Sequence, residues 1–588
     1  MDFNQILLSV DKPARYAGGE YNSANLDKEN ATRFCICMPD LYEVGMSNLG
    51  LKLLYHRLND EEKVICERCF APADDFAKEI TEAGLPLMSL ESKTPLKNFD
   101  MVGFSVQYEM LYTNILYMLD LAKIPFYAKD RGEEYPIIVS GGPSAVNPEP
   151  YAEFMDLIMV GEGEEMLPAL VALYREHKAR EHFDKWEFIR DAQKIEGIYA
   201  PMFNTPENRK TVRKAVVNDF DNCYYPTAQI IPAIEIVHDR AMVELFRGCA
   251  NGCRFCQAGF YYRPIRYRKG ETVAKLCCGV AFDSGFDEIS LGSLSTGDYP
   301  YLEDTLTQLK PFVSKRRISL ALPSLRLDSF KGDFVESSRK NSLTFAPEAG
   351  TQRLRNVINK NVTEENIETA MRAAFSQGYN SIKLYFMMGL PTETDEDLEG
   401  IAHVVKKIRW IFSSMRKGAL NISVSCAVFV PKPLTPFQWV PQISLEEMER
   451  RQNFLREKLK IKNVAFHYHD GKTSFLEAVF ARGDRNLAKV IEKAYQLGAK
   501  FDGWTEYFDY DRWMQAFDLC GVDAKSYVAE RDIDKPLPWS FIDCGVSERF
   551  LKAEYKKSLL AQSTPSCLVN CQGCGASSYC KCNEVDDK

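Results

Sequence analysis

The feature that most constrains this chain is a C-x3-C-x2-C spacing near its middle, formed by Cys249, Cys253 and Cys256. The apolar residues 242–246 before it predict a short buried strand, and the glycines that follow let the next loop turn tightly. Such a loop can direct three thiolates to one centre, and thiolates bind iron–sulfur clusters or zinc. Because a structural zinc site is closed by four ligands, three cysteines favour a 4Fe-4S cluster that keeps one iron free.

The strand, the loop and Phe255 just before the last cysteine together resemble the signature of radical S-adenosylmethionine (SAM) enzymes. The resemblance implies that Cys249, Cys253 and Cys256 bind three irons and that the amino and carboxylate groups of SAM bind the fourth. Reductive cleavage of SAM would then give methionine and a 5′-deoxyadenosyl radical. This spacing alone leaves open a zinc knuckle or three unrelated cysteines, but the motifs downstream favour the cluster.

The length and the charge of the chain set its broad class. At 588 residues it is too long for one ordinary domain, so about three domains are expected. The net charge of −9 argues against a basic nucleic-acid surface over the whole protein. We see no signal peptide and no segment near the ~20 apolar residues of a membrane span. Eighteen cysteines without a secretory signal then predict metal or redox chemistry in a reducing cytoplasm.

Residues 1–225 alternate apolar, strand-like runs with helical patterns, which predicts a doubly wound parallel sheet. Ligands of such sheets bind at the carboxyl ends of the strands, and here these ends carry Ser105, Gly141, Gly142 and Gly161. The order of the motifs resembles the cobalamin-binding domain at the front of many radical SAM proteins. The resemblance implies that these four residues contact a cofactor.

One residue departs from the pattern of that domain. Tyr42 stands in a D-x-Y-x-x-G motif where the family carries the histidine that binds cobalt. A phenol is a poor cobalt ligand at neutral pH, whereas a neutral imidazole is a good one. We therefore weigh two alternatives equally. One is a corrinoid whose lower face lacks histidine ligation, and the other is a retained scaffold that binds no corrinoid.

Residues 226–455 repeat a strand-then-helix rhythm with six strand-like runs, which predicts an open, partial (β/α)6 barrel. The active sites of such barrels lie at the carboxyl ends of the strands, where the cysteine loop also stands. The resemblance to radical SAM enzymes extends to the later strand ends and implies further SAM contacts from Ser293, Ser295, Glu348, Gly389 and Val428. Glu348 is expected to make a polar contact, Gly389 to pack on the adenine, and Val428 to offer it backbone groups.

Basic and aromatic residues alternate directly after the cysteine loop, over residues 254–269. Cations between aromatic rings can follow a nucleic-acid strand by charge and stacking, which keeps RNA open as a partner. The other interpretation, which we favour, is that the aromatic rings shield the cluster while the cations are solvated or tune its charge.

Residues 456–588 are expected to form a small accessory α+β domain, in which Trp504 and Trp513 pack against the barrel. A second C-x3-C-x2-C spacing follows at Cys567, Cys571 and Cys574, with Cys580 and Cys582 behind it. Four thiolates can close a zinc site or hold an auxiliary iron–sulfur cluster. A thiol-rich tail without metal is the alternative.

Over nearly its full length the chain resembles a family of radical SAM proteins with an N-terminal cobalamin-binding-like domain and a cysteine-bearing C-terminus. The resemblance implies SAM cleavage and hydrogen abstraction from an unknown substrate in the cytoplasm, with flavodoxin or ferredoxin as electron donor and no membrane partner. Two alternatives stay open. One is a cobalamin-dependent methyltransferase or methylthiotransferase-like enzyme that modifies RNA or a ribosomal component. The other is a non-catalytic iron–sulfur or zinc binding protein.

Overall fold

The computed structural model describes residues 3–323, 326–327 and 342–579. Its N-terminal unit is a sheet in the order β2-β1-β3-β4-β5-β6. The strands are β1 (Thr32–Met38), β2 (Val64–Phe70), β3 (Met101–Ser105), β4 (Ile137–Gly141), β5 (Leu157–Met159) and β6 (Ile198–Tyr199). Strands β1 to β5 are parallel, and β6 closes one edge antiparallel to β5. The expected doubly wound parallel sheet is therefore confirmed.

Strand β2 is not among the runs that the apolar pattern predicts. Its middle residues Glu67 and Arg68 break that pattern, yet every residue of Val64–Phe70 is buried. Arg68 Nη2 lies 2.9 Å from Glu20 Oε2, and its Nε lies 2.7 Å from Glu91 Oε1. Charges can be buried when they are paired in this way. The charged residues in the middle of β2 are therefore the reason why the sequence did not predict this buried strand.

The barrel strands form two parallel sheets within the described residues. One contains β8 (Ala241–Glu244), β11 (Glu288–Gly292) and β12 (Ser319–Ala321), and the other contains β13 (Leu343–Glu348), β14 (Ser381–Met388), β15 (Asn421–Val428) and β16 (Val464–Tyr468). All six expected strands are present. Strand β16 pairs with β15 and carries the sheet past residue 455, where the sequence placed a domain boundary.

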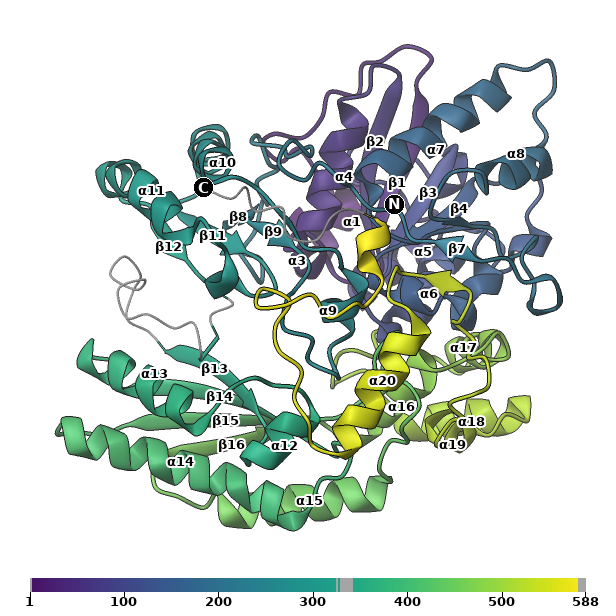
Figure 1. Ribbon diagram of the computed structural model, residues 1–588. Coiled ribbons are helices and arrows are strands. Elements are labelled where there is room, and N and C mark those ends of the chain that lie inside the picture. Colours follow the sequence, from purple (N-terminus) through teal and green to yellow (C-terminus); the bar gives the residue numbers. More distant parts are fainter. Residues whose placement is uncertain (1–2, 324–325, 328–341, 580–588) are drawn as a thin grey trace.

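Helices cover the outer face of each barrel sheet (Figure 1). They are α10 (Gly270–Ser284) and α11 (Leu302–Arg316) on the first sheet, and α13 (Glu364–Ser376), α14 (Asp395–Met415) and α15 (Leu445–Lys458) on the second. Alternate residues of β14 are buried under these helices, while Tyr385 on the opposite face is 45% exposed. Within the described ranges, no helix combines the length and apolar character that a bilayer crossing requires.

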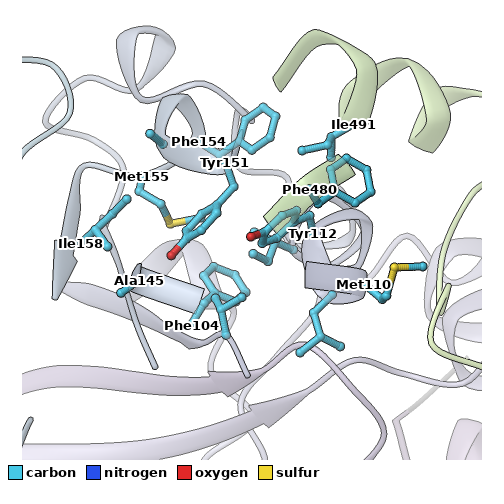
Figure 2. Close-up of a cluster of buried hydrophobic side chains, with 14 of the residues drawn as sticks. Phe104, Met110, Tyr112, Ala145, Tyr151, Phe154, Met155, Ile158, Phe480 and Ile491 are labelled. Carbon is cyan, nitrogen blue, oxygen red and sulfur yellow. The ribbon is translucent and has the colours of Figure 1, made fainter. Parts of the chain in front are cut away.

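The accessory helices pack mainly on the N-terminal unit. They are α16 (Gly471–Ala481), α17 (Leu487–Gln496) and α18 (Tyr510–Cys520). Figure 2 shows Phe480 and Ile491 from these helices facing Tyr112 and Tyr151 of the N-terminal unit. The rings of Tyr112 and Phe480 meet edge to face, with their centroids 5.6 Å apart. The two ends of the chain thus share one hydrophobic core.

The two tryptophans that were expected to face the barrel lie at this contact instead. Trp504 Nε1 donates to Asp40 Oδ1 at 3.1 Å, which joins the accessory region to the N-terminal unit. Trp513 Nε1 donates to Asp502 Oδ1 at 2.9 Å, and the other oxygen of Asp502 accepts from Thr113 Oγ1 at 2.6 Å. A buried indole N–H needs an acceptor. The expectation was wrong because the aromatic composition does not say which surface offers that acceptor.

Candidate active site

The cysteine loop lies at the carboxyl end of β8, between β9 (Phe246–Arg247) and the short helix α9 (Gln257–Tyr261). Gly248 opens the loop with φ at 91°, and a Cβ there would lie 2.9 Å from a backbone oxygen across the loop. Only glycine fits this turn. At the other end, Cys256 Sγ accepts a hydrogen bond from the Gly259 N–H at 3.4 Å and caps α9. The loop is therefore fixed at both ends.

A chain of hydrogen bonds positions the first cysteine. Asn251 Nδ2 donates to Cys249 Sγ at 3.6 Å and to Asp298 Oδ2 at 2.7 Å. Ser295 Oγ donates to the same oxygen of Asp298 at 2.7 Å. Ser295, which the sequence placed near the SAM amino group, is 1% exposed. Its hydroxyl is thus engaged in orienting the loop from the end of β11.

The three thiols of the loop are half-buried. Burial raises the pKa of Cys249 and raises that of Cys256 to about 12, and the charge of Lys360 opposes the rise at Cys256. Such thiols ionise when a metal shares their charge. In the part of the chain that the structure describes, no three Cys, His, Asp or Glu side chains converge on a single ion. An iron–sulfur cluster fits the loop, because its cysteines bind different irons.

An acid and a base stand beside the cysteine loop. Glu348, at the end of β13, has φ at 66°, a backbone conformation that is uncommon outside glycine and that clusters at functional sites. Lys360 Nζ lies 3.3 Å from Glu348 Oε1. Burial raises the pKa of Glu348, and the charge of Lys360 opposes that rise. This pair places a carboxyl and an ammonium group where the sequence predicts a polar contact to SAM.

The ends of β14 and β15 meet where the sequence predicts an adenine contact. Val428 is the register partner of Met388, so Gly389 follows directly at this edge. Gly389 has φ at 83°, and its N–H donates to Glu393 Oε2 at 2.7 Å. Glu393 also pairs with Arg451 of α15, and its side chain is 1% exposed. The turn that is expected to face adenine is thus held by a buried carboxyl.

Glu393 should make stability depend on pH. Burial raises its pKa from 4.5 to about 7, although the Gly389 N–H and Arg451 oppose the rise. Because the folded pKa exceeds the unfolded one, the carboxyl stabilises fully below the unfolded pKa, and this contribution is lost as pH rises through about 7. From pH 6 to pH 8 the loss is about 1 kcal/mol. We expect the stability of Glu393→Gln, measured by thermal unfolding, to fall less between pH 6 and pH 8 than that of the wild type. Glu396→Gln, at an exposed position, is the control and should fall as the wild type does. Equal slopes in all three proteins would contradict the assignment.

A cavity of about 670 Å³ joins the N-terminal sheet to the barrel. One wall is the carboxyl edge of the N-terminal sheet, lined by Gly103, Ser105, Gly141, Gly142 and Gly161. The opposite wall is the barrel edge, lined by Met242, Gly248, Gly292 and Ser293. The structure therefore brings together the four residues that the sequence placed at a corrinoid site, and it adds Ser293 from the SAM side.

Tyr42 is not among the residues that line the cavity. It is 1% exposed, and its hydroxyl donates to Glu20 Oε1 at 3.1 Å and accepts from the Ala233 N–H at 3.2 Å. Burial raises the pKa of this phenol further. A tyrosine engaged in this way is not available to a metal in the cavity. The lining residues do include a histidine, His238, which comes from the connector before β8.

The sequence did not identify the charged wall of the cavity. Arg247 pairs with Glu162, Glu164 and Glu244, and all four residues line the cavity. A signal was present in the G-E-G-E motif at residues 161–164, where glycines alternate with carboxylates. The partner Arg247 lies 83 positions after Glu164, so the pairing could not be read from the motif.

Of the five basic residues after the cysteine loop only Lys269 is exposed, and the four arginines do not form a nucleic-acid surface. Arg254, Arg263, Arg266 and Arg268 are each 5% exposed or less. Arg266 Nη1, for example, lies 2.6 Å from Glu162 Oε2. Cations that are buried cannot follow a nucleic-acid backbone, so this support for RNA is withdrawn. These arginines are not solvated either, and instead they fix the loop to its surroundings.

Arg254 ties the cysteine loop to helix α20 (Glu548–Leu559). Its side chain is fully buried, and Nη2 lies 3.0 Å from Glu554 Oε2. Its Nε also donates to Glu554 Oε2 at 3.1 Å, and Nη1 and Nη2 donate to backbone carbonyls at positions 356, 357 and 562. The neighbouring Phe255 is half-buried and packs on apolar side chains of α12 (Gln352–Val357). The centre of the loop is therefore anchored in protein on both sides.

We expect Arg254→Met to lower the free energy of unfolding by about 3–5 kcal/mol, because Glu554 keeps, among the described side chains, only Lys557 and Thr564 as partners and three backbone carbonyls lose their donor. Urea unfolding of the iron-free proteins, followed by tryptophan fluorescence, would measure the loss. Arg254→Lys keeps the charge but loses the forked geometry, so it should lose less. A change below about 1 kcal/mol for Arg254→Met would contradict a structural role for the pair.

The C-terminal tail returns to the cysteine loop. The Cys567 N–H donates to the carbonyl of Ala250 at 3.0 Å, so the second cysteine motif lies against the first. Cys571 is exposed, whereas Cys574 is 9% exposed. Cys580 and Cys582 lie outside the described residues.

The chain has relatives over both halves of this site. Family models described as "Radical SAM proteins, N-terminal" and "Radical SAM superfamily" match residues 50–201 and 243–405. The chain is 30% identical to Uncharacterized protein MJ0966 of Methanocaldococcus jannaschii, over 78% of this chain and 90% of that protein. It is 22% identical to a tRNA-2-methylthio-N(6)-dimethylallyladenosine synthase of Ehrlichia canis, over 52% of this chain and 71% of that protein.

Among solved structures, the chain is similar to the radical S-adenosylmethionine methyltransferase TsrM from Kitasatospora setae, with a TM-score of 0.47 and 14% identity over 67% of this chain and 75% of that one. The family matches and the cysteine loop at a strand end agree on the chemistry, and they set aside the non-catalytic alternative. The chain belongs to the radical SAM superfamily, in the family of MJ0966, and it is an enzyme whose cofactors are a 4Fe-4S cluster and SAM.

Proposed function

We propose that this radical SAM enzyme binds a corrinoid in the cavity between the N-terminal sheet and the barrel, and that it transfers a methyl group to its substrate. The observation that carries the proposal is the cavity itself. Open α/β sheets bind ligands outside the carboxyl ends of their strands, and this cavity occupies that edge. Its volume of about 670 Å³ lies in the range of about 300–1,000 Å³ that ligand sites occupy.

Glycines make the sheet edge accessible to a broad, flat ligand. A Cβ on Gly142 would lie 2.6 Å from the carbonyl oxygen of Val106, and one on Gly161 would lie 2.2 Å from that of Ala215. Both glycines have a positive φ, so no other residue fits there without strain. A ligand at this edge therefore meets backbone rather than side chains at Gly142 and Gly161. This cradle fits a corrin ring.

Polar groups flank the glycine edge. Gln107 Nε2 donates to Ser105 Oγ at 2.7 Å, and both residues line the cavity. Together they offer amide and hydroxyl groups to the polar substituents of a ring that lies on the edge. The charged wall formed by Arg247 and its carboxylates closes another side. Few polar groups on a mostly apolar wall are typical of cofactor sites.

When bound, the cluster supplies the electron that cleaves SAM and the corrinoid supplies a carrier for the methyl group. The chain contributes placement. The three cysteines of the loop hold the cluster, Glu348 and Lys360 face the charged groups of SAM, and Gly389 carries the adenine contact. Gly248 both opens the cysteine loop and lines the cavity, so the two cofactor sites share a boundary. A corrinoid held in the cavity would therefore lie next to the loop that would hold the cluster.

Transfer RNA is the first substrate to test. A relative named for the modification of tRNA matches 52% of this chain. The buried arginines after the loop remove one route to RNA binding, so the substrate would have to approach through the open face of the second barrel sheet. On that face Tyr385 is 45% exposed and Lys383 is exposed as well.

The test is anaerobic reconstitution with iron, sulfide and hydroxocobalamin, followed by gel filtration and cobalt analysis. We expect about one cobalt per chain. After addition of SAM, a reductant and total tRNA, 5′-deoxyadenosine and S-adenosylhomocysteine should both form. A protein that keeps its iron but retains no cobalt would refute the corrinoid and leave the N-terminal unit as a scaffold.

A further inference from the structure

The tail after α20 is bonded along the whole SAM cluster loop. The Cys567 N–H donates to Ala250 O at 3.0 Å. Three residues earlier in the tail, the Thr564 N–H donates to Asn359 Oδ1 at 2.7 Å. Asn359 Nδ2 in turn donates to the carbonyls of residues 251 and 252, at 3.3 Å and 3.1 Å. The first residue of the second cysteine motif is therefore bonded to the residue that directly follows Cys249. Figure 1 shows the tail lying beside α9.

The second cysteine motif is itself a shaped turn. Gly573 and Gly575 have φ at 66° and 105°, as Gly248 and Gly252 have positive φ in the first motif. The Ser547 N–H donates to Cys574 O at 2.8 Å, which fixes the buried end of the turn. The middle of the turn is open to solvent, since Cys571 is exposed and Val569 is 78% exposed. The motif thus spans the distance from the SAM cluster loop to the surface.

Among the described residues no carboxylate pairs with Arg263, a buried cation beside Gly252 of the first motif that lies over the rings of Phe260 and Phe550. Arg263 is 4% exposed, and its Nε donates to Gly259 O at 3.0 Å. Its Nη1 has no hydrogen-bond partner among the described residues. An unpaired buried cation is costly, so the site calls for an anion. A thiolate-ligated cluster is anionic.

We propose that Cys567, Cys571 and Cys574 hold a second iron–sulfur cluster against the SAM cluster loop, and that electrons reach the SAM cluster through it. The three thiols come from one short turn, and the cluster would lie between the unpaired Arg263 and the solvent. The proposal rests on the radical SAM activity and is independent of the corrinoid.

The electron balance is simple. A reduced flavodoxin or ferredoxin loses one electron to the tail cluster at the exposed side of the turn. The tail cluster passes that electron to the SAM cluster and returns to its oxidised state. SAM takes the electron as its C5′–S bond breaks, which gives methionine and the 5′-deoxyadenosyl radical. One electron enters for each SAM that is cleaved, and no further reductant is required.

Metal analysis of the full chain tests the site. We expect about eight irons per chain after anaerobic reconstitution, and about four after replacement of all three tail cysteines by serine. Replacement of Cys249, Cys253 and Cys256 should also leave about four. Cys520→Ser, in a half-buried thiol on α18, should keep all eight. Equal iron in the wild type and the tail variant, or one zinc in place of iron, would overturn the proposal.

Spectra of the unaltered protein give a test that does not depend on the folding of a variant. Reduction should give two paramagnetic cluster signals, and SAM should change only one of them, because Glu348 and Lys360, the expected SAM contacts, lie beside the first cysteine loop. A single signal that SAM changes completely would overturn the second cluster. Arg263→Met should lose the signal that SAM does not change, and its iron content should fall accordingly. Arg263→Lys should keep both the signal and the iron.

The relay role has its own readout. We would compare the rate of 5′-deoxyadenosine formation with reduced flavodoxin to the rate with titanium(III) citrate. The ratio of the two rates should fall at least about 10-fold in the tail variant and stay unchanged in Cys520→Ser. An unchanged ratio in the tail variant would overturn electron entry through the tail. Failure to bind cobalt would leave every one of these outcomes unaffected, so the two proposals can fail separately.

Discussion

Cys253→Ala is expected to reduce the formation of 5′-deoxyadenosine from SAM to the level without enzyme, a loss on the order of 1,000-fold or more. The loop offers three thiols to the cluster, and with two of them the cluster is held too loosely to present one iron to SAM. The buried setting of Cys249 and Cys256 strengthens this expectation, because thiols with raised pKa values do not stay ionised without the shared charge of the metal.

The measurement is anaerobic and quantifies 5′-deoxyadenosine beside the iron content of each protein. Cys520→Ala is a matched control, since this thiol lies on α18 away from both cysteine motifs. It should keep both the iron and the activity. Wild-type turnover from Cys253→Ala would contradict the assignment of the loop. Absence of turnover from a wild type that keeps its cluster would mean that a substrate or donor is required first.

The cluster loop could be predicted because its information is local. Three cysteines, the strand before them and the glycines between them lie within 18 residues, so spacing and composition describe the turn. The parallel sheets could also be predicted, since their buried strands are apolar runs. Strand β2 shows the limit of that argument. Arg68 in its centre is buried only because Glu20 and Glu91 pair with it, and neither partner is near it in sequence.

The packing of the accessory helices was not predictable for a similar reason. A tryptophan such as Trp504 is expected to be buried against whichever surface is available to it. Its hydrogen bond to Asp40 spans 464 positions, so the sequence did not indicate which surface that would be. The burial of the basic residues after the loop also depends on distant partners, since Arg254 meets Glu554 across 300 positions. The sequence shows which side chains, such as those of Arg and Trp, can lie either in the core or at the surface. They do not predict whether a carboxylate elsewhere will bury a cation.

The cavity could be predicted only in part, because one of its walls follows from local sequence patterns and the other from contacts between distant residues. Its glycine edge was visible in sequence as a series of strand ends, whereas its opposite wall comes from the barrel and could be placed only by the fold. A single bulky side chain at the glycine edge should therefore test the corrinoid without touching the SAM site. Ser105 is suited to this, because it ends β3, lines the cavity and is not itself a positive-φ residue.

Ser105→Trp is expected to reduce bound cobalt from about one per chain to below about 0.1 after loading with hydroxocobalamin, since the indole takes up part of a volume of about 670 Å³. The variant should keep its iron, because Ser105 does not contact the cysteine loop. Ser376→Trp, at the exposed end of α13, controls for a surface tryptophan and should bind cobalt normally. Thermal unfolding of both variants checks that the sheet is intact.

Cobalt retained by Ser105→Trp at the wild-type level would place the corrinoid elsewhere. Loss of cobalt together with S-adenosylhomocysteine, while 5′-deoxyadenosine still forms, would separate methyl transfer from SAM cleavage and assign the first to the cavity and the second to the cysteine loop.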